Sequence, residues 1–401
     1  MKKINKVLVV NCGSSSLKFQ LFDMKGEKML CKGLVERIGI AGSRLVYTKT
    51  GCEKIVRETP MKNHVEAIRQ VMAVLCDAAC GVVKSLSELD AIGHRVVHGG
   101  DKFSAPAKIT AAAKKLIQKC VPLAPLHNPA NLQGIEACEK AAKGVPNVAV
   151  FDTAFHQTMP GCAYTYAIPR KVARKFGIRK YGFHGTSHKY ITQAAAAWLK
   201  KPLARVNLVT CHLGNGSSIA AVKNGACVDT TMGLTPLAGL VMGTRCGDID
   251  VGAVLSIMEA EKKTPEEMDT LLNKKSGLLA LTGSSDCRDI CAKAAKGDKQ
   301  AELALEMLAY RTALYIGAYN TVIGGADAIV MTGGIGENSS EVRERIVKRL
   351  GALGIKLDRK ANKIRGTLGV ISTKDSKIPV VVIPTNEELA IAQDTARIVK
   401  G

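Results

Sequence analysis

One pattern occurs twice in this chain, about half its length apart. Residues 6–24 read as an apolar strand, a Gly/Ser turn and a second strand that alternates apolar and polar residues over 17–21. Residues 207–225 repeat this layout, with the turn at 214–218. Alternation with a period of two is typical of a half-buried strand. The repeat favours a duplicated α/β fold with a cleft between the copies; chance similarity of two hairpins is the alternative.

The rest of the chain alternates between helical and strand patterns. We expect helices at 64–80, 298–322 and 387–400, and strands at 89–97, 147–151, 328–331 and 378–383. Asp298 is an expected N-cap, as is Asn386 or Thr385, because a short polar side chain can accept from the first backbone N–H groups of a helix. Strands that alternate with helices indicate an α/β fold with parallel or mixed sheets.

Length and composition agree with a multidomain globular protein. The chain has 401 residues, of which 46% are hydrophobic and 23% charged, close to the globular average. No apolar run approaches the roughly 20 residues that cross a bilayer, and the apolar stretch at 7–10 is too short for a signal peptide. We therefore expect a soluble, cytoplasmic protein with no membrane partner.

The net charge is +22, with an isoelectric point near 9.5. Such a surface can attract nucleic acid, anionic membranes or phosphorylated small molecules. Aromatic residues make up only 4% of the chain, and the lysines are scattered rather than interleaved with aromatic residues. These two features argue against nucleic acid as a partner.

The thirteen cysteines include no Cys-x-x-Cys motif. Two cysteine pairs and two histidine pairs have i,i+4 spacing: Cys76/Cys80, Cys287/Cys291, His94/His98 and His184/His188. None has a partner pair at zinc-finger distance, and nearby glycines argue against uninterrupted helix at the histidines. We expect reduced, mostly buried thiols and no structural zinc.

Several familiar active-site motifs are absent, including the P-loop, the dinucleotide fingerprint and the Gly-x-Ser-x-Gly elbow. Instead, four Gly/Ser turns are expected directly after strands, at 13–16, 214–218, 283–285 and 333–336. Such turns let backbone N–H groups approach an anion without obstruction by side chains. Four of them in one basic chain favour a nucleotide phosphate site.

Isolated charged or imidazole side chains stand beside these glycines. They are Arg95, Asp152, His184 and Arg245. Each can be a surface or capping residue, but a place in a glycine-containing loop favours a functional role.

Nine segments together carry a specific resemblance. They are 11–18, 93–100, 125–129, 151–156, 181–188, 212–217, 283–288, 332–338 and 384–388. In their order and spacing they resemble the acetate kinase family over essentially the whole chain. That family belongs to the superfamily of sugar kinases, actin and heat-shock chaperone ATPases, which implies two duplicated actin-like (ribonuclease H-like) domains around a nucleotide cleft.

The resemblance implies reversible, direct in-line transfer of the ATP γ-phosphoryl group to acetate with Mg²⁺, for which Mn²⁺ can substitute. Arg95 would hold the carboxylate, while Arg245 and His184 would stabilise the transferring group. Asp152 resembles the catalytic carboxylate of the family. Acetate is already ionised at neutral pH, so we expect Asp152 to orient an arginine or magnesium-bound water rather than to act as a base. The metal residues would be Asn11 and Glu387.

The resemblance also assigns binding residues and domains. The acyl pocket would comprise Arg95, Val97, Leu126, Phe183 and Pro236. The nucleotide residues would be Lys18, His127, His212, Leu213, Gly214, Asn215, Gly216, Asp286, Cys287, Arg288, Gly334, Ile335, Gly336, Glu337 and Asn338. Residues 1–152 with 387–401 would form the acyl and phosphate side and residues 153–386 the nucleotide-binding domain, in a homodimer.

Cys287 is a mild departure from the family pattern, and we expect its side chain to turn away from the nucleotide. Two alternative functions stay open. A propionate kinase shares nearly all these motifs. A chaperone-like ATPase would need a further peptide-binding domain, for which 401 residues leave no room.

Overall fold

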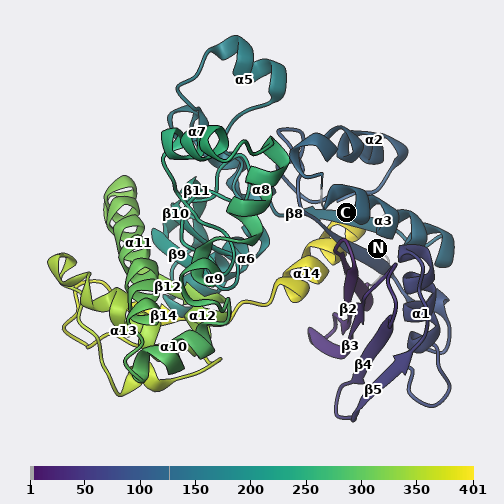
Figure 1. Cartoon of the computed structure of the whole chain (residues 1–401). Helices are drawn as coiled ribbons and strands as arrows, with labels where there is room; N and C mark the ends of the chain where they lie inside the picture. The colour runs from purple at the N-terminus through teal and green to yellow at the C-terminus, as the bar shows by residue number, and fades with distance from the viewer. Residues whose placement is uncertain (1–3, 126) are drawn as a thin grey trace. The chain divides into compact units, whose positions relative to one another are not determined.

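The computed structural model describes residues 4–125 and 127–401 (Figure 1). The chain forms two compact units. Unit 1 comprises Met1–Ala154 and Asn386–Gly401, so the C-terminal helix belongs with the N-terminal half. Unit 2 comprises Phe155–Thr385. Leu126, expected in the acyl pocket, lies outside the described residues.

Unit 1 is built on an eight-stranded sheet with the order β5-β4-β3-β2-β1-β6-β8-β7. The strands are β1 Lys6–Cys12, β2 Ser16–Asp23, β3 Lys28–Glu36, β4 Arg44–Lys49, β5 Lys54–Glu58, β6 Ala91–Val96, β7 Ala107–Lys108 and β8 Asn147–Phe151. Its helices are α1 His64–Leu75, α2 Ala111–Lys119, α3 Asn128–Ala141 and α14 Glu387–Lys400. β1 pairs antiparallel with β2 and parallel with β6, which in turn pairs parallel with β8.

Unit 2 is built on a six-stranded sheet with the order β11-β10-β9-β12-β14-β13. The strands are β9 Leu208–Leu213, β10 Ser217–Lys223, β11 Ala226–Thr230, β12 Ala328–Thr332, β13 Gly369–Val370 and β14 Val380–Val382. Its helices are α4 Gly161–Tyr164, α5 Arg170–Phe176, α6 Gly185–Trp198, α7 Val251–Ala260, α8 Pro265–Lys274, α9 Gly277–Thr282, α10 Cys287–Ala295, α11 Lys299–Ile323, α12 Gly333–Asn338 and α13 Ser340–Lys348. No helix in the described residues is both long enough and apolar enough to span a membrane.

The two sheets share one plan, as the repeated hairpin predicts. In each, the first strand of the hairpin has its antiparallel partner on one side and a parallel strand on the other: β1 lies between β2 and β6, and β9 between β10 and β12. A further parallel strand follows, β8 in unit 1 and β14 in unit 2. The duplicated α/β fold is therefore confirmed.

Capping side chains set the helix boundaries that were predicted best. The side chain of Asp298 accepts hydrogen bonds from the first N–H groups of α11, and Asn386 caps α14 in the same way. At the other end of α11, Gly324 adopts the left-handed conformation (φ 79°) that commonly ends helices.

Four expected boundaries or turns are wrong. The helix expected at 64–80 ends at Leu75, because the side chain of Asp77 accepts from the backbone of residues 79 and 80 and forms a turn. The strand expected at 378–383 is Val380–Val382. The segment 333–336 is the start of α12 rather than a turn, and the Gly283 turn follows helix α9 rather than a strand.

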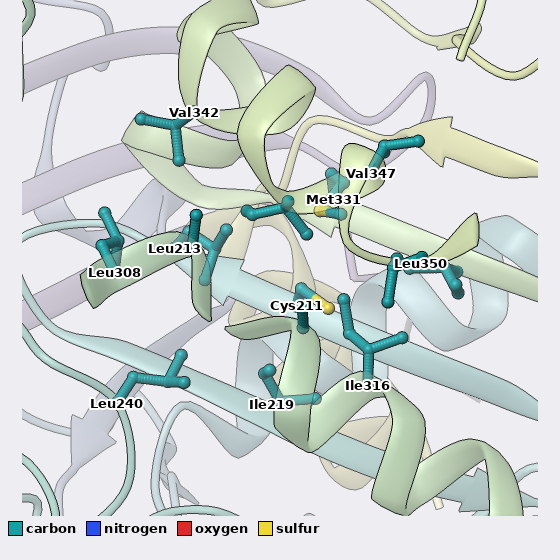
Figure 2. Close-up of a cluster of buried hydrophobic side chains, with 14 of the residues drawn as sticks. Cys211, Leu213, Ile219, Leu240, Leu308, Ile316, Met331, Val342, Val347 and Leu350 are labelled. Atoms are coloured by element: carbon teal, nitrogen blue, oxygen red, sulfur yellow. The ribbon is translucent and has the colours of Figure 1, made fainter. Parts of the chain in front are cut away.

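Apolar side chains cover one face of the unit 2 sheet. Figure 2 shows Cys211, Leu213 and Ile219 from β9 and β10 against side chains of the neighbouring helices. These include Leu308 and Ile316 of α11. Burial of such side chains contributes roughly 1.5–3 kcal/mol each. This core fixes β9 and its turn, where expected phosphate-binding residues lie.

In unit 1, α14 packs on β1, β6 and β8. Gly93 on β6 makes the close approach possible: a Cβ there would lie 2.9 Å from Cγ2 of Ile391. The packing places Glu387, the first residue of α14, beside the strands that carry Asn11 and Arg95.

We predict that His94 on β6 makes folding stability depend on pH. Its side chain is buried, with Nε2 2.7 Å from the Asn147 Oδ1, and burial lowers its pKa to about 4. Between the ordinary pKa of about 6.5 and pH 4 the unfolded chain binds a proton that the folded protein does not, so stability falls as the pH falls. From pH 7 to 5, His94 should account for a loss of about 2 kcal/mol.

The measurement is urea unfolding of wild type and His94→Gln at pH 7 and pH 5. Other buried histidines contribute equally to both proteins, so the difference between the two pH dependences isolates His94. The variant should lose about 2 kcal/mol less than wild type between the two pH values. Equal losses would show that His94 does not titrate abnormally.

Candidate active site

Five expected site residues of unit 1 lie where strands end or a helix begins. Asn11 pairs in register with Lys18 across the β1–β2 hairpin. Arg95 lies near the end of β6, Asp152 directly follows β8, and Glu387 opens α14. Because β1, β6 and β8 are parallel, their carboxyl ends share one edge of the sheet, where ligands of α/β proteins commonly bind. We call these five residues the unit 1 cluster.

A two-point ion pair joins Arg95 to Asp152. The Arg95 Nε lies 3.1 Å and its Nη2 2.5 Å from Oδ2 of Asp152, and its Nη1 donates to Oδ1 of Asn11 at 3.4 Å. Asp152 is only 1% exposed. Burial alone would lower the pKa of Arg95, but the charges of Asp152 and Glu387 outweigh that effect and raise it. Arg95 is therefore a fixed cation held in a set orientation.

Glu387 carries a partly buried carboxyl group close to two other acidic side chains, those of Asp152 and Glu388. Burial raises its pKa to about 7; the charge of Arg95 opposes this rise, and Asp152 and Glu388 add to it. A further cation nearby would stabilise the charged form of this carboxyl group. The environment of Glu387 therefore fits a divalent metal ion.

Among the residues that the structure describes, no three His, Cys, Asp or Glu side chains are grouped closely enough to hold a metal ion by themselves. This pattern does not conflict with Mg²⁺, which keeps several waters and takes other ligands from substrate phosphates. An amide oxygen from Asn11 and a carboxylate from Glu387 are suitable donors for such a partly hydrated ion.

In unit 2, His184 has an unusual backbone that presents its ring toward the β9–β10 turn. It is the N-cap of α6 and adopts a left-handed conformation (φ 57°), which is uncommon for a residue other than glycine. Its Nδ1 lies 2.9 Å from the Ser218 Oγ, and its ring centre lies 4.4 Å from that of His212. Strain of this kind persists where the surroundings over-determine the geometry.

Buried hydrogen bonds fix the position of both rings. The Ser218 hydroxyl also bonds to Nε2 of His188 at 2.8 Å, and Nδ1 of His188 bonds to the Thr210 hydroxyl. Burial lowers the pKa of His188 well below its usual value, so this ring is neutral at physiological pH. A second chain runs from Nδ1 of His212 to the Ser187 hydroxyl and on to that of Thr385.

Arg245 lies beside the same turn without an anionic partner. Its Nη1 donates to the Pro236 carbonyl oxygen at 3.0 Å and contacts the Met242 sulfur, and no carboxylate of residues 155–385 pairs with it. Burial lowers its pKa. A Cβ built on Gly216 would lie 3.3 Å from Nε2 of His184 and 3.4 Å from Nη1 of Arg245. His184, His212, Gly216, Ser218 and Arg245 form what we call the unit 2 cluster.

The remaining residues of the β9–β10 turn are held by backbone contacts. Leu213 is buried in the sheet. The Gly214 N–H donates to the Ser217 hydroxyl at 3.2 Å, and the Asn215 carbonyl accepts from the Gly243 N–H at 2.9 Å. The turn is thus tied to the segment that carries Arg245.

Two further expected nucleotide segments border the same core. Asp286 caps α10 and pairs with Arg288, whose side chain is 90% exposed, whereas Cys287 points inward and is 8% exposed. Cys287 packs into the unit 2 core, and its orientation away from the nucleotide stays a prediction. In α12, Gly334 and Asn338 are exposed, Gly336 is buried and Ile335 packs on the core.

The Glu337 carboxylate points back into the protein. Its Oε1 accepts from the N–H groups of Gly333 at 2.9 Å and Thr385 at 3.0 Å. Gly333 needs its positive φ of 77°, and a Cβ there would lie 2.7 Å from a backbone oxygen. Glu337 therefore fixes the start of α12, and its carboxylate does not face the solvent side where Gly334 lies.

The expected acyl-pocket residues are divided between the units. Val97 is buried in unit 1 and donates its N–H to Oδ1 of Asn131. Phe183 is buried and Pro236 partly buried in unit 2. His127 is exposed at the start of α3.

The sequence did not predict which residues hold the imidazoles, namely His188, Ser218, Ser187 and Thr385; His188 was noted only as half of a histidine pair and Thr385 only as a possible N-cap. Ser187, His188 and Thr385 lie inside the nine segments that carry the family resemblance, and Ser218 directly follows one of them. Their proximity in sequence to His184, Gly216 or Glu387 could have identified them, since buried ring nitrogens need hydrogen-bond partners.

The two sheets, which share one plan and carry polar clusters at their loop ends, define a two-domain α/β protein. Comparison with known proteins narrows this class. The profile of the Acetokinase family matches residues 6–393. The chain belongs to this family.

Relatives match over nearly their full length. The acetate kinase of Carboxydothermus hydrogenoformans is 55% identical over 394 residues, which cover 98% of this chain and 99% of the relative. The acetate kinase of Methanosarcina acetivorans is also 55% identical, covering 98% and 97%.

Solved structures agree with the fold. The acetate kinase of Porphyromonas gingivalis superposes with a TM-score of 0.95 at 46% identity, covering 98% of this chain and all of that one. A propionate kinase from Francisella tularensis superposes with a TM-score of 0.93 at 43% identity, covering 98% and 100%.

Proposed function

We propose that this protein is an acetate kinase, which transfers the γ-phosphoryl group of ATP reversibly to acetate and forms acetyl phosphate and ADP. One observation carries the proposal beyond family membership. Arg245 carries a partly buried guanidinium with no carboxylate partner in its unit, directly beside a glycine turn and a fixed imidazole. A transferring phosphoryl group supplies the missing anion.

The chemistry requires two anions to approach each other. An acetate oxygen forms a bond to the γ-phosphorus while the bond to the bridging oxygen of ADP breaks, and no proton needs to move because acetate is ionised at neutral pH. Charge is spread over the three equatorial oxygens in the transition state. Fixed positive groups aimed at these oxygens therefore lower the barrier.

The chain's own residues divide these tasks. Arg95 holds the acetate carboxylate, with its guanidinium oriented by the pair with Asp152. Arg245 stabilises the equatorial oxygens, and His184 donates to them. Asp152 serves as an orienting group rather than as a base, since both its oxygens already accept from Arg95.

Mg²⁺ would be held by Asn11 and Glu387, with Mn²⁺ as a possible substitute, and would neutralise charge on the β- and γ-phosphates. The carboxyl pKa of Glu387, which burial raises to about 7, supports a cation at this position. Lys18 adds a positive charge near Glu387.

Unit 2 would bind the nucleotide and unit 1 the acid and the transferred phosphate. His212 to Gly216 would face the phosphates, with His127 nearby. The exposed Arg288 and Gly334, together with Asp286 and Asn338, would border the adenosine.

We further propose a cytoplasmic homodimer. All thirteen cysteines are free, as expected in a reducing compartment. On α11, Leu303, Tyr310 and Leu314 are each about half exposed and recur at helical spacing. An apolar stripe on a long helix fits a self-complementary interface.

Acetate is the preferred acid over propionate in this proposal. Carboxylate-binding groups cannot distinguish the two acids, so the choice falls to apolar residues. Val97 is buried, and its β-branched side chain is stiff at χ1, so it cannot easily make room for a further methylene.

We predict that Arg245→Ala and Arg95→Lys each lower kcat by about 10²–10³-fold, since each removes a group aimed at developing charge. Lysine keeps a charge beside the buried Asp152 but lacks the planar fork of arginine. The measurement is acetyl phosphate formation from ATP, Mg²⁺ and acetate, trapped with hydroxylamine.

Thermal melting of each variant provides the control for folding. A kcat within tenfold of wild type in a variant with unchanged melting would remove the assigned role of that arginine. Gly351→Ala is a surface control, because this glycine is exposed and a Cβ built on it would meet no atom within 4 Å.

We predict that wild type uses propionate about 10–200-fold less efficiently than acetate, as expected for one methylene in an apolar pocket. Val97→Ala should narrow this gap, chiefly by lowering KM for propionate. The test compares kcat/KM for the two acids in both proteins. A wild type that prefers propionate would replace the acetate assignment with the propionate alternative.

A further inference from the structure

Cys287 and Cys291 form a close dithiol at the edge of the unit 2 core. The two residues lie one turn apart on α10, and their sulfur atoms are 4.0 Å apart. The sulfur of Cys291 is also 3.9 Å from the hydroxyl of Ser339, the residue between α12 and α13. Cys287 is buried, whereas Cys291 is partly exposed.

We propose that this pair is an oxidation site at which a peroxide converts the two thiols into an intrahelical disulfide that weakens nucleotide binding. The effect on the nucleotide rests on the function proposed above, because the residues that flank the pair are those assigned to adenosine. The proposal that the disulfide forms rests only on the proximity of the two sulfur atoms.

The two thiols are not equivalent. A hydrogen bond from Cys287 lowers the pKa of Cys291, and the same contact raises that of Cys287. The thiolate, which is the nucleophile, therefore forms at the more accessible sulfur. Cys291 is the first to react and Cys287 the resolving thiol.

The reaction proceeds in two balanced steps. The Cys291 thiolate attacks hydrogen peroxide, so that an S–O bond forms, the O–O bond breaks and hydroxide leaves, giving a sulfenic acid. Cys287 then attacks the Cys291 sulfur; the S–S bond forms, the S–O bond breaks, and the hydroxyl group leaves with the Cys287 proton as water. The two sulfurs together lose two electrons to the peroxide.

The new bond must deform the start of α10. Residues four apart on a helix have Cβ atoms about 5–6 Å apart, whereas a disulfide needs about 3.5–4.5 Å. Cys287 is the first residue of the helix, so the first turn of α10 is the part that can change its conformation. That turn contains Asp286, whose side chain accepts from the Arg288 N–H at 2.8 Å.

The deformation therefore falls on the residues that border the nucleotide. Asp286 and Arg288 flank Cys287 directly, and Ser339 adjoins the segment Gly334–Asn338. Moving Cys291 relative to Ser339 would disturb the second segment as well. ATP affinity should fall by about tenfold on oxidation, within the range of typical coupling between sites.

Trypsin makes the disulfide easy to detect, because it cuts after Arg288 and Lys293 and so separates the two cysteines. Wild type is treated with hydrogen peroxide and digested without reductant. We expect a linked pair of peptides, 276–288 and 289–293, that separates on reduction with dithiothreitol. ATP binding is measured by calorimetry on the same samples before oxidation, after oxidation and after reduction.

Cys291→Ser is the test variant, since it removes the reactive thiol and lies outside the assigned nucleotide residues. Its ATP affinity should equal that of reduced wild type and stay unchanged by peroxide. Cys76→Ser is the matched control: it removes a thiol from the other i,i+4 pair, and its ATP affinity should still fall with peroxide as in wild type.

Absence of the linked peptides in oxidised wild type would overturn the dithiol site. Linked peptides with unchanged ATP affinity would overturn its effect on the nucleotide. Failure of reduced wild type to bind ATP would count against the proposed function instead, while the linked peptides would still decide whether the disulfide forms.

Discussion

A guanidinium that is partly withdrawn from water needs an anion, and the two site arginines, both partly buried, meet this need in opposite ways. Arg95 has its partner within the protein, since Asp152 is almost fully buried against it and Asn11 accepts from its remaining edge. Within residues 155–385, Arg245 contacts a backbone carbonyl and a sulfur atom but no carboxylate, and burial lowers its pKa. The first arginine is a fixed part of the fold, and in the function proposed above the second binds an anion that arrives with the substrate.

The duplicated sheet explains how the chain can hold such groups. In each unit a hairpin and adjacent parallel strands bring loop residues to one edge of the sheet, and helices packed on its faces fix the strands. Further hydrogen bonds then fix polar side chains at that edge. For example, the Ser218 hydroxyl bonds to both His184 and His188. Preorganisation of this kind lowers the reorganisation needed during phosphoryl transfer.

Features governed by local chemistry were predictable from the sequence. The period of two revealed the hairpins, and capping side chains located the ends of α11 and α14 closely. The helix after His64 was predicted too long because its apolar spacing continues past Asp77, where a side-chain turn ends the helix. The six-residue helix α12 is too short to show a helical period at all.

The candidate site was predictable in composition but not in geometry. The motifs name Arg95, Asp152, His184 and Arg245, yet nothing in their spacing says that Asp152 binds Arg95 while Arg245 lacks a carboxylate in its own unit. Such pairing depends on side chains from distant strands, since Arg95 and Asp152 come from β6 and the end of β8. The close approach of Cys287 to Cys291 likewise depends on rotamers rather than on spacing alone.

The most direct test of this account is the stability of Arg245→Met with and without a transition-state mimic. Replacing a partly buried cation that pairs with no carboxylate of residues 155–385 by an apolar side chain should leave the free energy of unfolding within about 1 kcal/mol of wild type or raise it. Mg²⁺, ADP, aluminium fluoride and acetate together should raise the melting temperature of wild type but not that of the variant. A variant that is less stable without ligands and gains as much as wild type with them would contradict the assignment of Arg245 as the group that awaits the phosphoryl anion.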